Sequence, residues 1–296
     1  MSNLMNILVV GLLLGGIYGL VSIGLNLIFG VIRIVNFAQG ELVMLGMYGA
    51  YACYLMLDMD PYLSILVVVP ALFVFGVLIQ RFILQPLQNE PSMQIFATFG
   101  LLLLLQNIVL AVTRGTGYTV PTDLSSVVID VAGLKISLVR LIALFAVTIV
   151  AVAMSWFLRH TLPGKAIRAV TQDRRAARHM GINVELTFML TFGIGAALAG
   201  LAGTLLAPIY TMSPQIGGNF ILAAFAVVVL GGLGSVWGAF IGGFIIGLIE
   251  ALAGYYLDPA LKHAVWFLVF IAVLIIRPGG LFGIVGAEEV GLREQH

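Results

Sequence analysis

The stretch RHTLPGKAIRAVTQDRRAARHMGINVE, residues 159–185, decides how this chain is organised. Its first twenty residues hold six of the chain's fourteen Lys and Arg residues and one acidic residue, Asp173. Sixty-four uncharged residues follow, from Leu186 to Ile249. Short loops rich in Lys and Arg stay on the cytoplasmic side when apolar segments cross a membrane. We therefore predict that residues 159–185 form a cytoplasmic loop between membrane spans.

The composition of the whole chain supports this placement. The chain is 61% hydrophobic and 9% charged, with a mean hydropathy of +1.13, whereas a soluble domain is about 25% charged. No apolar-poor segment is long enough for a soluble domain. We therefore predict an all-α fold, a polytopic membrane helical bundle that forms a single domain over residues 1–296. The net charge of +1 provides no field to attract nucleic acid.

Long apolar runs give the candidate spans, because a helix needs about 20 apolar residues to cross a bilayer. One run, 219–256, is too long for one perpendicular helix at about 1.5 Å per residue. It contains Gly231-Gly232-Leu233-Gly234-Ser235, a predicted break, so it is either two crossings or one crossing with a re-entrant piece. We expect eight to nine spans in total. The runs are 5–30, 35–57, 62–80, 93–113, 137–158, 186–209, 219–256 and 262–278.

The basic loop also sets the expected side of the other connections. If residues 159–185 are inside, the connections at 81–92 and at Arg33 are inside too. The loop 114–135, the Asp58/Asp60 turn and the N-terminus are then outside. The C-terminus is inside if the run 219–256 crosses twice, and outside if it crosses once.

Glycines spaced by four residues predict close helix packing. Small residues let helix backbones approach in lipid, where no hydrophobic force drives helices together. Packing within the bundle is favoured over a dedicated dimerisation face. The sets are Gly11/Gly15/Gly19, Gly238/Gly242 and Gly243/Gly247.

Motifs for catalysis and cofactor binding are missing. The sequence has no G-x-x-x-x-G-K-[ST] for nucleotide phosphates and no H-E-x-x-H. Its single cysteine, Cys53, excludes an internal disulfide and a multi-cysteine metal cluster. The four histidines are dispersed, at His160, His179, His263 and His296. We expect neither an enzyme nor a metal site.

Polar residues inside apolar runs are candidates for a substrate path, since such residues usually face a cavity or a partner. Two of these groups have an alternative role: the segment 36–41 could be an interfacial cap, and the pair 106–107 could form a helix–helix hydrogen bond. Glu250 is expected at a helix end, beside Tyr255 and Tyr256. The path candidates are Asn26, Asn36, Gln39, Glu41, Gln106 and Asn107.

The basic loop itself predicts a short amphipathic helix. Thr161 and Pro163 suit its start and Gly181 its end. One face carries Arg168, Thr171, Arg175 and Arg178, and the other carries Ala166, Val170, Asp173, Ala177 and Met180. Such a helix either lies against anionic lipid or docks in a groove of a cytoplasmic protein. Periodicity alone favours lipid.

Several motifs, in order along nearly the whole chain, resemble those of branched-chain amino acid ABC importer permeases of the LivH type. NFAQGE at 36–41 with MLG at 44–46 resembles the family's early signature. GKAIRAV at 164–170, QD at 172–173 and GIN at 181–183 resemble its cytoplasmic loop. GGLGS at 231–235 and RPGGLFG at 277–283 are similar to its late signature and its ending.

The resemblance implies a type II-like importer permease in the bacterial inner membrane, forming half of a translocation pore. Its partners would be a second permease of the LivH/LivM type, two ATP-binding subunits that bind ATP and Mg, and a periplasmic solute-binding protein. The basic loop would then dock on an ATPase instead of lipid. The coupling residues would be Arg168, Asp173, Arg175, Ala176, Ala177 and Gly181. Related permeases often carry Glu-Ala-Ala before the loop glycine, whereas this chain has Arg175 at the first position.

Two other functions compete with this one. A secondary transporter would need acidic or histidine residues in mid-span as an ion relay, and only Glu41 and Glu250 qualify. A channel would need a filter-like loop or charged rings, for which 231–235 is a faint candidate. The sequence does not identify the solute: leucine-like amino acids are the family default, and related permeases take urea, amides or aromatic acids.

Overall fold

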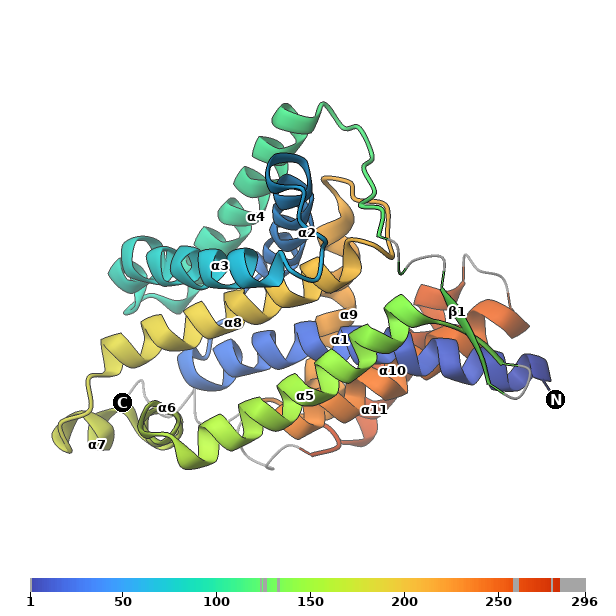
Figure 1. Cartoon of the computed structure of the whole chain (residues 1–296). Coiled ribbons are helices and arrows are strands. Elements are labelled where there is room, and N and C mark those ends of the chain that lie inside the picture. The colour runs from blue at the N-terminus through green and yellow to red at the C-terminus, as the bar shows by residue number, and fades with distance from the viewer. Residues whose placement is uncertain are drawn as a thin grey trace.

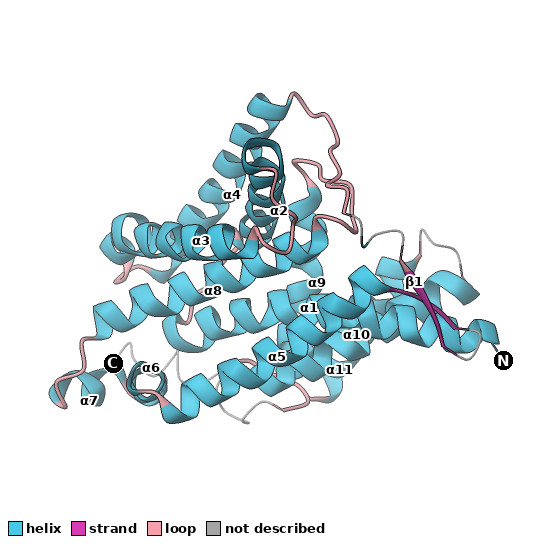
Figure 2. Ribbon diagram, in the orientation of Figure 1, coloured by secondary structure: helices cyan, strands magenta, loops and turns pink. Residues whose placement is uncertain are grey.

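The structure, a computed structural model, describes residues 2–122, 124, 127–131, 134–257, 261–277 and 279–282. Almost all of its regular structure is helical (Figures 1 and 2). Pro278, Gly283 and His296, named above, lie outside the described residues. The elements are α1 (Ser2–Ile32), α2 (Gln39–Leu57), α3 (Ile65–Ile79), η1 (Gln80–Leu84), η2 (Gln85–Leu87), α4 (Pro91–Thr113), β1 (Val128–Val131), β2 (Leu134–Ser137), α5 (Leu138–His160), α6 (Leu162–Gln172), α7 (Arg174–His179), α8 (Val184–Leu206), α9 (Ile216–Gly231), α10 (Val236–Tyr256) and α11 (Lys262–Ile276).

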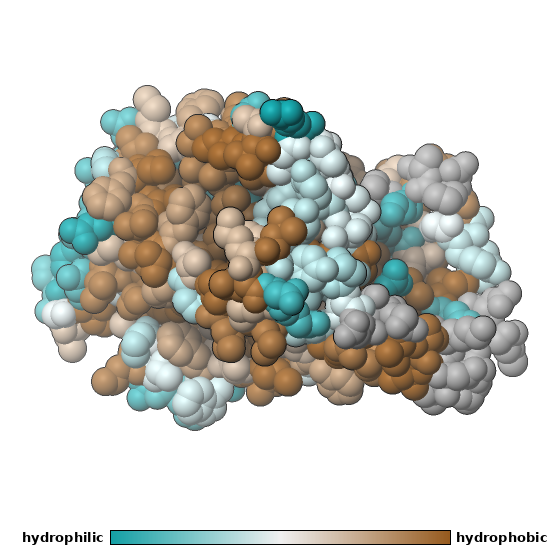
Figure 3. Space-filling view, turned by 45° about the horizontal axis from the view of Figure 1, so that its top comes forward, coloured by the Kyte–Doolittle hydropathy of each residue, from teal (hydrophilic) through white to brown (hydrophobic). Residues whose placement is uncertain are grey.

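The predicted all-α membrane bundle is confirmed. Seven helices in the described residues are long and apolar enough to cross a membrane, and two shorter apolar helices, at 216–231 and 264–276, bring the total to nine. The strands β1 and β2 form one antiparallel hairpin with Val128 opposite Ser137. In the space-filling view, hydrophobic residues cover much of the left half and the lower edge of the face shown, and hydrophilic residues lie at the left end and right of the centre (Figure 3). The chain is a multi-pass membrane protein.

The run 219–256 forms two helices that reverse direction. Gly232 and Gly234 adopt φ of 101° and 84°, which favour glycine, in the turn between α9 and α10. The helix α11 then returns, and the Leu281 N–H donates to the carbonyl oxygen of Leu230 at 2.8 Å. The described C-terminal residues therefore lie at the same end of the molecule as this turn.

The connections that were predicted to share a side do lie together. Gln85 donates to Glu185 at 3.4 Å, and Arg33 donates to the Thr171 carbonyl oxygen at 3.4 Å. At the other end of the bundle, the Thr122 hydroxyl donates to Asp60 at 2.9 Å. We call the first end the basic end: α6, α7, the last turn of α1, the start of α8 and the α9–α10 turn. That it faces the cytoplasm stays a prediction.

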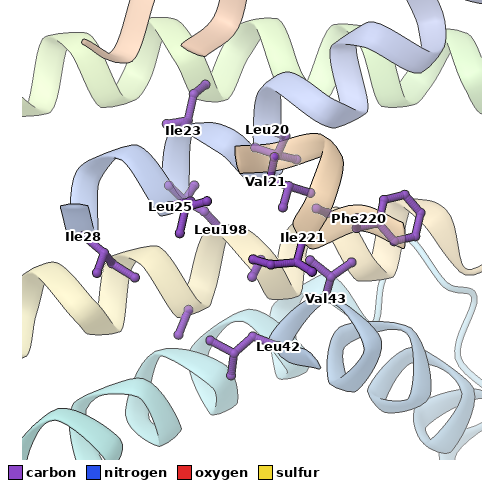
Figure 4. Close-up of a cluster of buried hydrophobic side chains, with 14 of the residues drawn as sticks. Leu20, Val21, Ile23, Leu25, Ile28, Leu42, Val43, Leu198, Phe220 and Ile221 are labelled. Carbon is purple, nitrogen blue, oxygen red and sulfur yellow. The ribbon is translucent and has the colours of Figure 1, made fainter. Parts of the chain in front are cut away.

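The helix α1 is the centre of the bundle, and it packs most extensively against α10. A Cβ atom added at Gly15 would lie 2.7 Å from the Gly243 carbonyl oxygen, so the two backbones are in direct contact. The glycine sets spaced by four therefore pack within the bundle, as predicted. Apolar side chains of α1, α2, α8 and α9 meet next to this contact and form the buried core drawn in Figure 4.

Candidate functional site

The helix α2 begins deep inside the bundle and not at its surface. After α1 ends, residues 33–38 run without helical structure, and α2 starts at Gln39. The Gln39 amide donates to the carbonyl oxygen of Gly195, which lies in the middle of α8. Figure 1 shows α2 inclined steeply against α1 and α8. The expectation of an interfacial cap at 36–41 is therefore wrong, because this segment lies at mid-bundle depth.

Side chains satisfy the non-helical backbone of this segment, as a membrane interior requires. The Thr98 hydroxyl of α4 donates to the Val35 carbonyl oxygen at 3.3 Å and accepts from the Phe37 N–H at 3.4 Å. Asn36 accepts from the Ala38 N–H at 3.1 Å and donates to the Gln39 side chain at 3.2 Å. Asn36 and Gln39, both predicted path residues, thus hold the break between α1 and α2.

Glu41 lies at the contact between the starts of α2 and α9. Gly40 and Gly217 touch through their backbones, and a Cβ atom at Gly217 would lie 2.8 Å from Glu41 Oε1. Glu41 is 2% exposed, and its Oε2 atom has no hydrogen-bond partner in the described part of the chain. A buried carboxyl oxygen without a partner costs stability, so Glu41 remains a candidate for function.

Asn26 holds two parts of the bundle together by hydrogen bonds. It is buried, its amide donates to the Ser235 carbonyl oxygen at 2.7 Å, and its oxygen accepts from the Gly234 N–H at 2.5 Å. These bonds attach α1 to the α9–α10 turn. The hydrogen-bonding groups of Asn26 are therefore used within the chain, and its role in a substrate path stays a prediction.

The other two path candidates lie on the outer surface of α4. Asn107 is exposed and donates to the Leu103 carbonyl oxygen of its own helix, and Gln106 is half-buried. Their role in a substrate path stays a prediction. The exposed face of α9 also carries polar side chains, Gln215 at its N-cap and Asn219 in its first turn. Sequence reasoning missed Asn219 because it stands alone in an apolar run.

An aromatic cluster connects these two faces at the start of α2. The Phe37 ring lies 6.2 Å from Phe99 of α4 and 5.6 Å from Phe225 of α9. Phe99 is 48% exposed on the outside of the chain. A surface lined by α4, the start of α2 and α9 therefore combines aromatic rings with the exposed amides. We call it the α4–α9 face.

The basic loop forms two helices in place of the single one predicted. Thr161 caps α6 by accepting from the Gly164 N–H, as predicted. Asp173 ends α6 and caps α7, accepting from the N–H groups of Ala176 and Arg175. Both hydrogen bonds lower the pKa of Asp173, and the bond from the Ala176 N–H has the larger effect. The helix breaks here because an exposed Asp favours a cap over a helix interior.

The apolar side of these helices is covered by the protein itself. Ile167 and Val170 are 2% and 1% exposed, and α6 packs against α1, α5 and α8. Ala177 is 4% exposed. The predicted face of Ala166, Val170, Asp173, Ala177 and Met180 is therefore wrong: it mixes buried residues with the exposed Asp173 and Met180. Because Val170 and Ala177 are covered by the protein itself, neither lipid anchorage through that face nor docking on Ala177 has support from the structure.

Two arginines at the basic end have structural roles: Arg174 of the basic loop and Arg33 at the end of α1. Arg174 donates to the carbonyl oxygens of Val31 and Ile32, the last of α1, at 3.2 and 2.6 Å. These carbonyls have no partner within the helix, so a cation there satisfies them. The guanidinium of Arg174 also lies 5.0 Å from the Phe188 ring centre. Arg33, with φ of 61°, bridges from the end of α1 to α6.

The remaining predicted coupling residues point outward at the basic end. Arg168, Arg175, Ala176 and Gly181 are exposed. Gly181 has φ of 84°, which strains any other residue, and nothing lies within 4 Å of an added Cβ. Beside it, a hollow of about 280 Å³ is lined by Arg178 and residues 181–185. The outer side of α7 and this hollow form what we call the coupling surface; its role stays a prediction.

Glu250 lies in a different environment from the expected helix end. It is buried, pairs with Lys262 at 3.1 Å and accepts from the Tyr18 hydroxyl at 2.8 Å. Tyr255 and Tyr256 are exposed beyond it. The carboxylate thus attaches α10 to α1 and to the start of α11. This ion pair gives Glu250 a structural role and weakens the case for an ion relay.

The chain matches the family model described as "Branched-chain amino acid transport system / permease component" over residues 7–274. It is 33% identical to the high-affinity branched-chain amino acid transport system permease protein LivH of Escherichia coli K12, over 95% of this chain and 96% of that protein. It is 32% identical to BraD of Pseudomonas aeruginosa, described in the same terms, over 96% and 97%. The chain is also 32% identical to a probable branched-chain amino acid transport permease protein LivH of Methanocaldococcus jannaschii, over 90% of this chain and 88% of that protein.

No solved structure matches the chain. The family match nevertheless covers nearly all of the bundle, from the first turns of α1 to the last turn of α11, and the relatives align end to end. The chain therefore belongs to the family of permease components of branched-chain amino acid transport systems.

Proposed function

We propose that this chain is one membrane-spanning half of an ATP-driven importer of branched-chain amino acids in the bacterial inner membrane. The observation that carries the proposal is the end-to-end likeness to LivH and BraD. This chain has no phosphate-binding motif, so ATP and Mg²⁺ would bind to two partner subunits at the basic end. A solute-binding protein would deliver the amino acid at the opposite end.

The coupling surface supports contact with an ATPase. Arg175 and Arg178 are exposed on α7, and Met180 beside them is 83% exposed. Arginine forms strong charge-assisted hydrogen bonds to carboxylates. A partner groove with acidic groups would therefore fit this surface, and a side chain of the partner would fit the hollow at Gly181. Because α6 and Arg174 attach this surface to α1, movement of the ATPase would move the bundle.

The α4–α9 face supports a pore shared with a second permease. Exposed amides such as Asn107 and Asn219 are costly against lipid, so they usually face a partner or a water-filled path. The aromatic cluster of Phe37, Phe99 and Phe225 joins the two helices, α4 and α9, that carry these amides. Apolar rings suit leucine-like side chains, and the amides suit the polar ends of an amino acid. The second permease would cover this face and complete the path.

Charge reversal tests the coupling surface. We expect Arg175→Glu together with Arg178→Glu to abolish co-purification of the ATP-binding subunits and ATP-dependent leucine uptake in vesicles. Arg81→Glu is the matched control, because Arg81 is exposed near the same end but belongs to η1. Ala176→Trp should also block docking by bulk, since Ala176 is exposed and its neighbour Ala177 is not. Normal uptake in the double variant would overturn the assignment.

An ion-gradient-driven transporter is the alternative, and uptake by reconstituted protein distinguishes the two. We expect accumulation of leucine only when the ATP-binding subunits and ATP are present. Accumulation driven by a proton or sodium gradient, without these subunits, would establish the alternative.

A further inference from the structure

A cavity of about 440 Å³ lies at the basic end, behind α6 and away from α7. Its walls come from four places: the last turns of α1, the end of α5, the side of α6 next to α5, which includes the exposed Arg168, and the α9–α10 turn. This volume is within the range of small-ligand sites, about 300–1,000 Å³. The coupling surface described above does not include this cavity.

The lining of this cavity is suited to an anion. It includes two arginines, Arg159 of α5 and Arg168 of α6, and neutral polar groups from Ser155, Thr171 and Gln172. None of the residues that line it is acidic. The Arg168 guanidinium donates to the Arg159 backbone carbonyl oxygen at 3.4 Å, which holds the two residues together. Among the described residues, neither guanidinium has a carboxylate within ion-pair distance.

The cavity is also placed where a phospholipid headgroup would lie. Trp237 lines it, donates to the Ser155 hydroxyl at 3.1 Å and is 40% exposed, and Trp156 is 60% exposed. Tryptophan is enriched at the boundary between lipid chains and water. From Trp156, the exposed residues Val152, Ile149 and Phe145 continue along one face of α5. This stripe is apolar, so acyl chains can lie along it.

We propose that this cavity binds the phosphate of an anionic phospholipid, with Arg159 and Arg168 as its ligands and the acyl chains along α5. Basic pockets between membrane helices at the cytoplasmic surface are typical sites for such headgroups. Arginine suits the phosphate because its planar fork donates two parallel hydrogen bonds. A bound headgroup would link α6 to α5 on the side away from α7. Arg168 would then bind the lipid phosphate and not the ATPase. This proposal does not depend on the transported solute or on the ATPase contact.

The test uses quenching of Trp237 fluorescence by brominated lipids. The full chain carries Trp156→Phe and Trp266→Phe, so that Trp237 is its one remaining tryptophan, and it is reconstituted in vesicles. One set of vesicles contains brominated phosphatidylglycerol and unbrominated phosphatidylcholine. The other set contains unbrominated phosphatidylglycerol and brominated phosphatidylcholine. We expect Trp237 to contact phosphatidylglycerol about 30-fold more often than phosphatidylcholine at equal lipid concentrations. This is the factor that two arginines provide at about 1 kcal/mol each.

Matched variants separate a built site from general attraction. Arg159→Gln with Arg168→Gln should bring the preference near parity. Arg175→Gln with Arg178→Gln removes the same charge from the same loop and should leave the preference unchanged. Arg159→Lys with Arg168→Lys keeps the charge and should retain a weakened preference. Thermal unfolding, followed at Cys53, establishes that each variant is folded. If the Gln pair fails to fold, the single change Arg168→Gln, at an exposed residue, carries the test.

Three results would overturn the proposal. Equal quenching by the two lipids in the unaltered cavity would show that no headgroup is selected. An equal loss of preference in the Arg175/Arg178 pair would show diffuse attraction to the basic loop. Loss of the preference on adding excess inorganic phosphate would show that the cavity takes a free phosphate and not a lipid.

Discussion

Replacing Asn26 by Leu tests whether this buried amide stabilises the contact between α1 and the α9–α10 turn or belongs to a substrate path. Leucine has nearly the same size, so the change removes hydrogen bonds without leaving a large void. It would remove the partner of the Gly234 N–H at 2.5 Å, whereas the Ser235 carbonyl oxygen would lose the Asn26 amide at 2.7 Å and keep the Ala239 N–H at 2.9 Å. Unsatisfied buried groups cost about 1–3 kcal/mol each, whereas polar pairs in membrane proteins average about 0.6 kcal/mol.

The cavity behind α6 reaches Asn26, so water can replace part of these bonds. We therefore expect a loss of about 2 kcal/mol, which corresponds to a lower Tm by roughly 4–8 °C at about 2–4 °C per kcal/mol. Cys53 is the chain's single cysteine and is buried. A thiol-reactive fluorescent dye therefore reports unfolding in detergent without further labelling.

Asn107→Leu is the matched control for this experiment. Asn107 is exposed and bonds only to the carbonyl oxygen four residues earlier in its own helix. Its replacement should change Tm by less than about 2 °C, since surface substitutions stay within about 0.5 kcal/mol. If Asn26→Leu melts at the same temperature as Asn107→Leu, the stabilising role of Asn26 is refuted.

Three further perturbations follow from the same contacts. Gly15→Ala should destabilise the chain by about 1–3 kcal/mol, because its Cβ would meet the α10 backbone. Gly254→Ala is the control and should leave the stability unchanged, because there is open space around Gly254. The Cys53 melting assay compares the two variants. Arg174→Gln should lower leucine uptake per ATP hydrolysed, because it loosens α7 from α1; unchanged stoichiometry would show that this contact transmits no movement. Glu41→Gln should retain ATP-dependent uptake, since the ATPases supply the energy, and loss of uptake with intact assembly would indicate that the ionisable group is required.

The sequence predicted well those features that depend on composition and spacing. Continuous apolar runs predicted the helices, and glycines spaced by four predicted close packing within the bundle, which the structure has between α1 and α10. The two glycines at 232 and 234 predicted the break between α9 and α10, because their backbone angles suit a turn. The single dense cluster of charge located the loop of α6 and α7. Each of these signals is local, so the neighbours in space are not needed to interpret it.

The sequence failed where the answer depends on depth or on neighbours in space. Hydropathy reports that residues 35–57 are apolar, but not that α2 starts only after an extended segment inside the bundle. Arg174 and Arg175 are identical in charge and adjacent in sequence, yet one caps α1 and the other faces outward. Periodicity assumed one continuous helix through Asp173, and this assumption placed Ala177 on the wrong face.

The placement of these arginines divides the basic loop between two tasks. Arg174 of this loop joins α7 to the end of α1, and Arg33 at the end of α1 joins it in turn to α6. The helix α1 in turn contacts α10 through glycine backbones and holds the α9–α10 turn through Asn26. The start of α9 touches the start of α2 at Gly217 and Gly40. A continuous series of contacts therefore connects α7 to the α4–α9 face, so we expect a displacement of α7 to reach the proposed path through these hydrogen bonds and packed backbones.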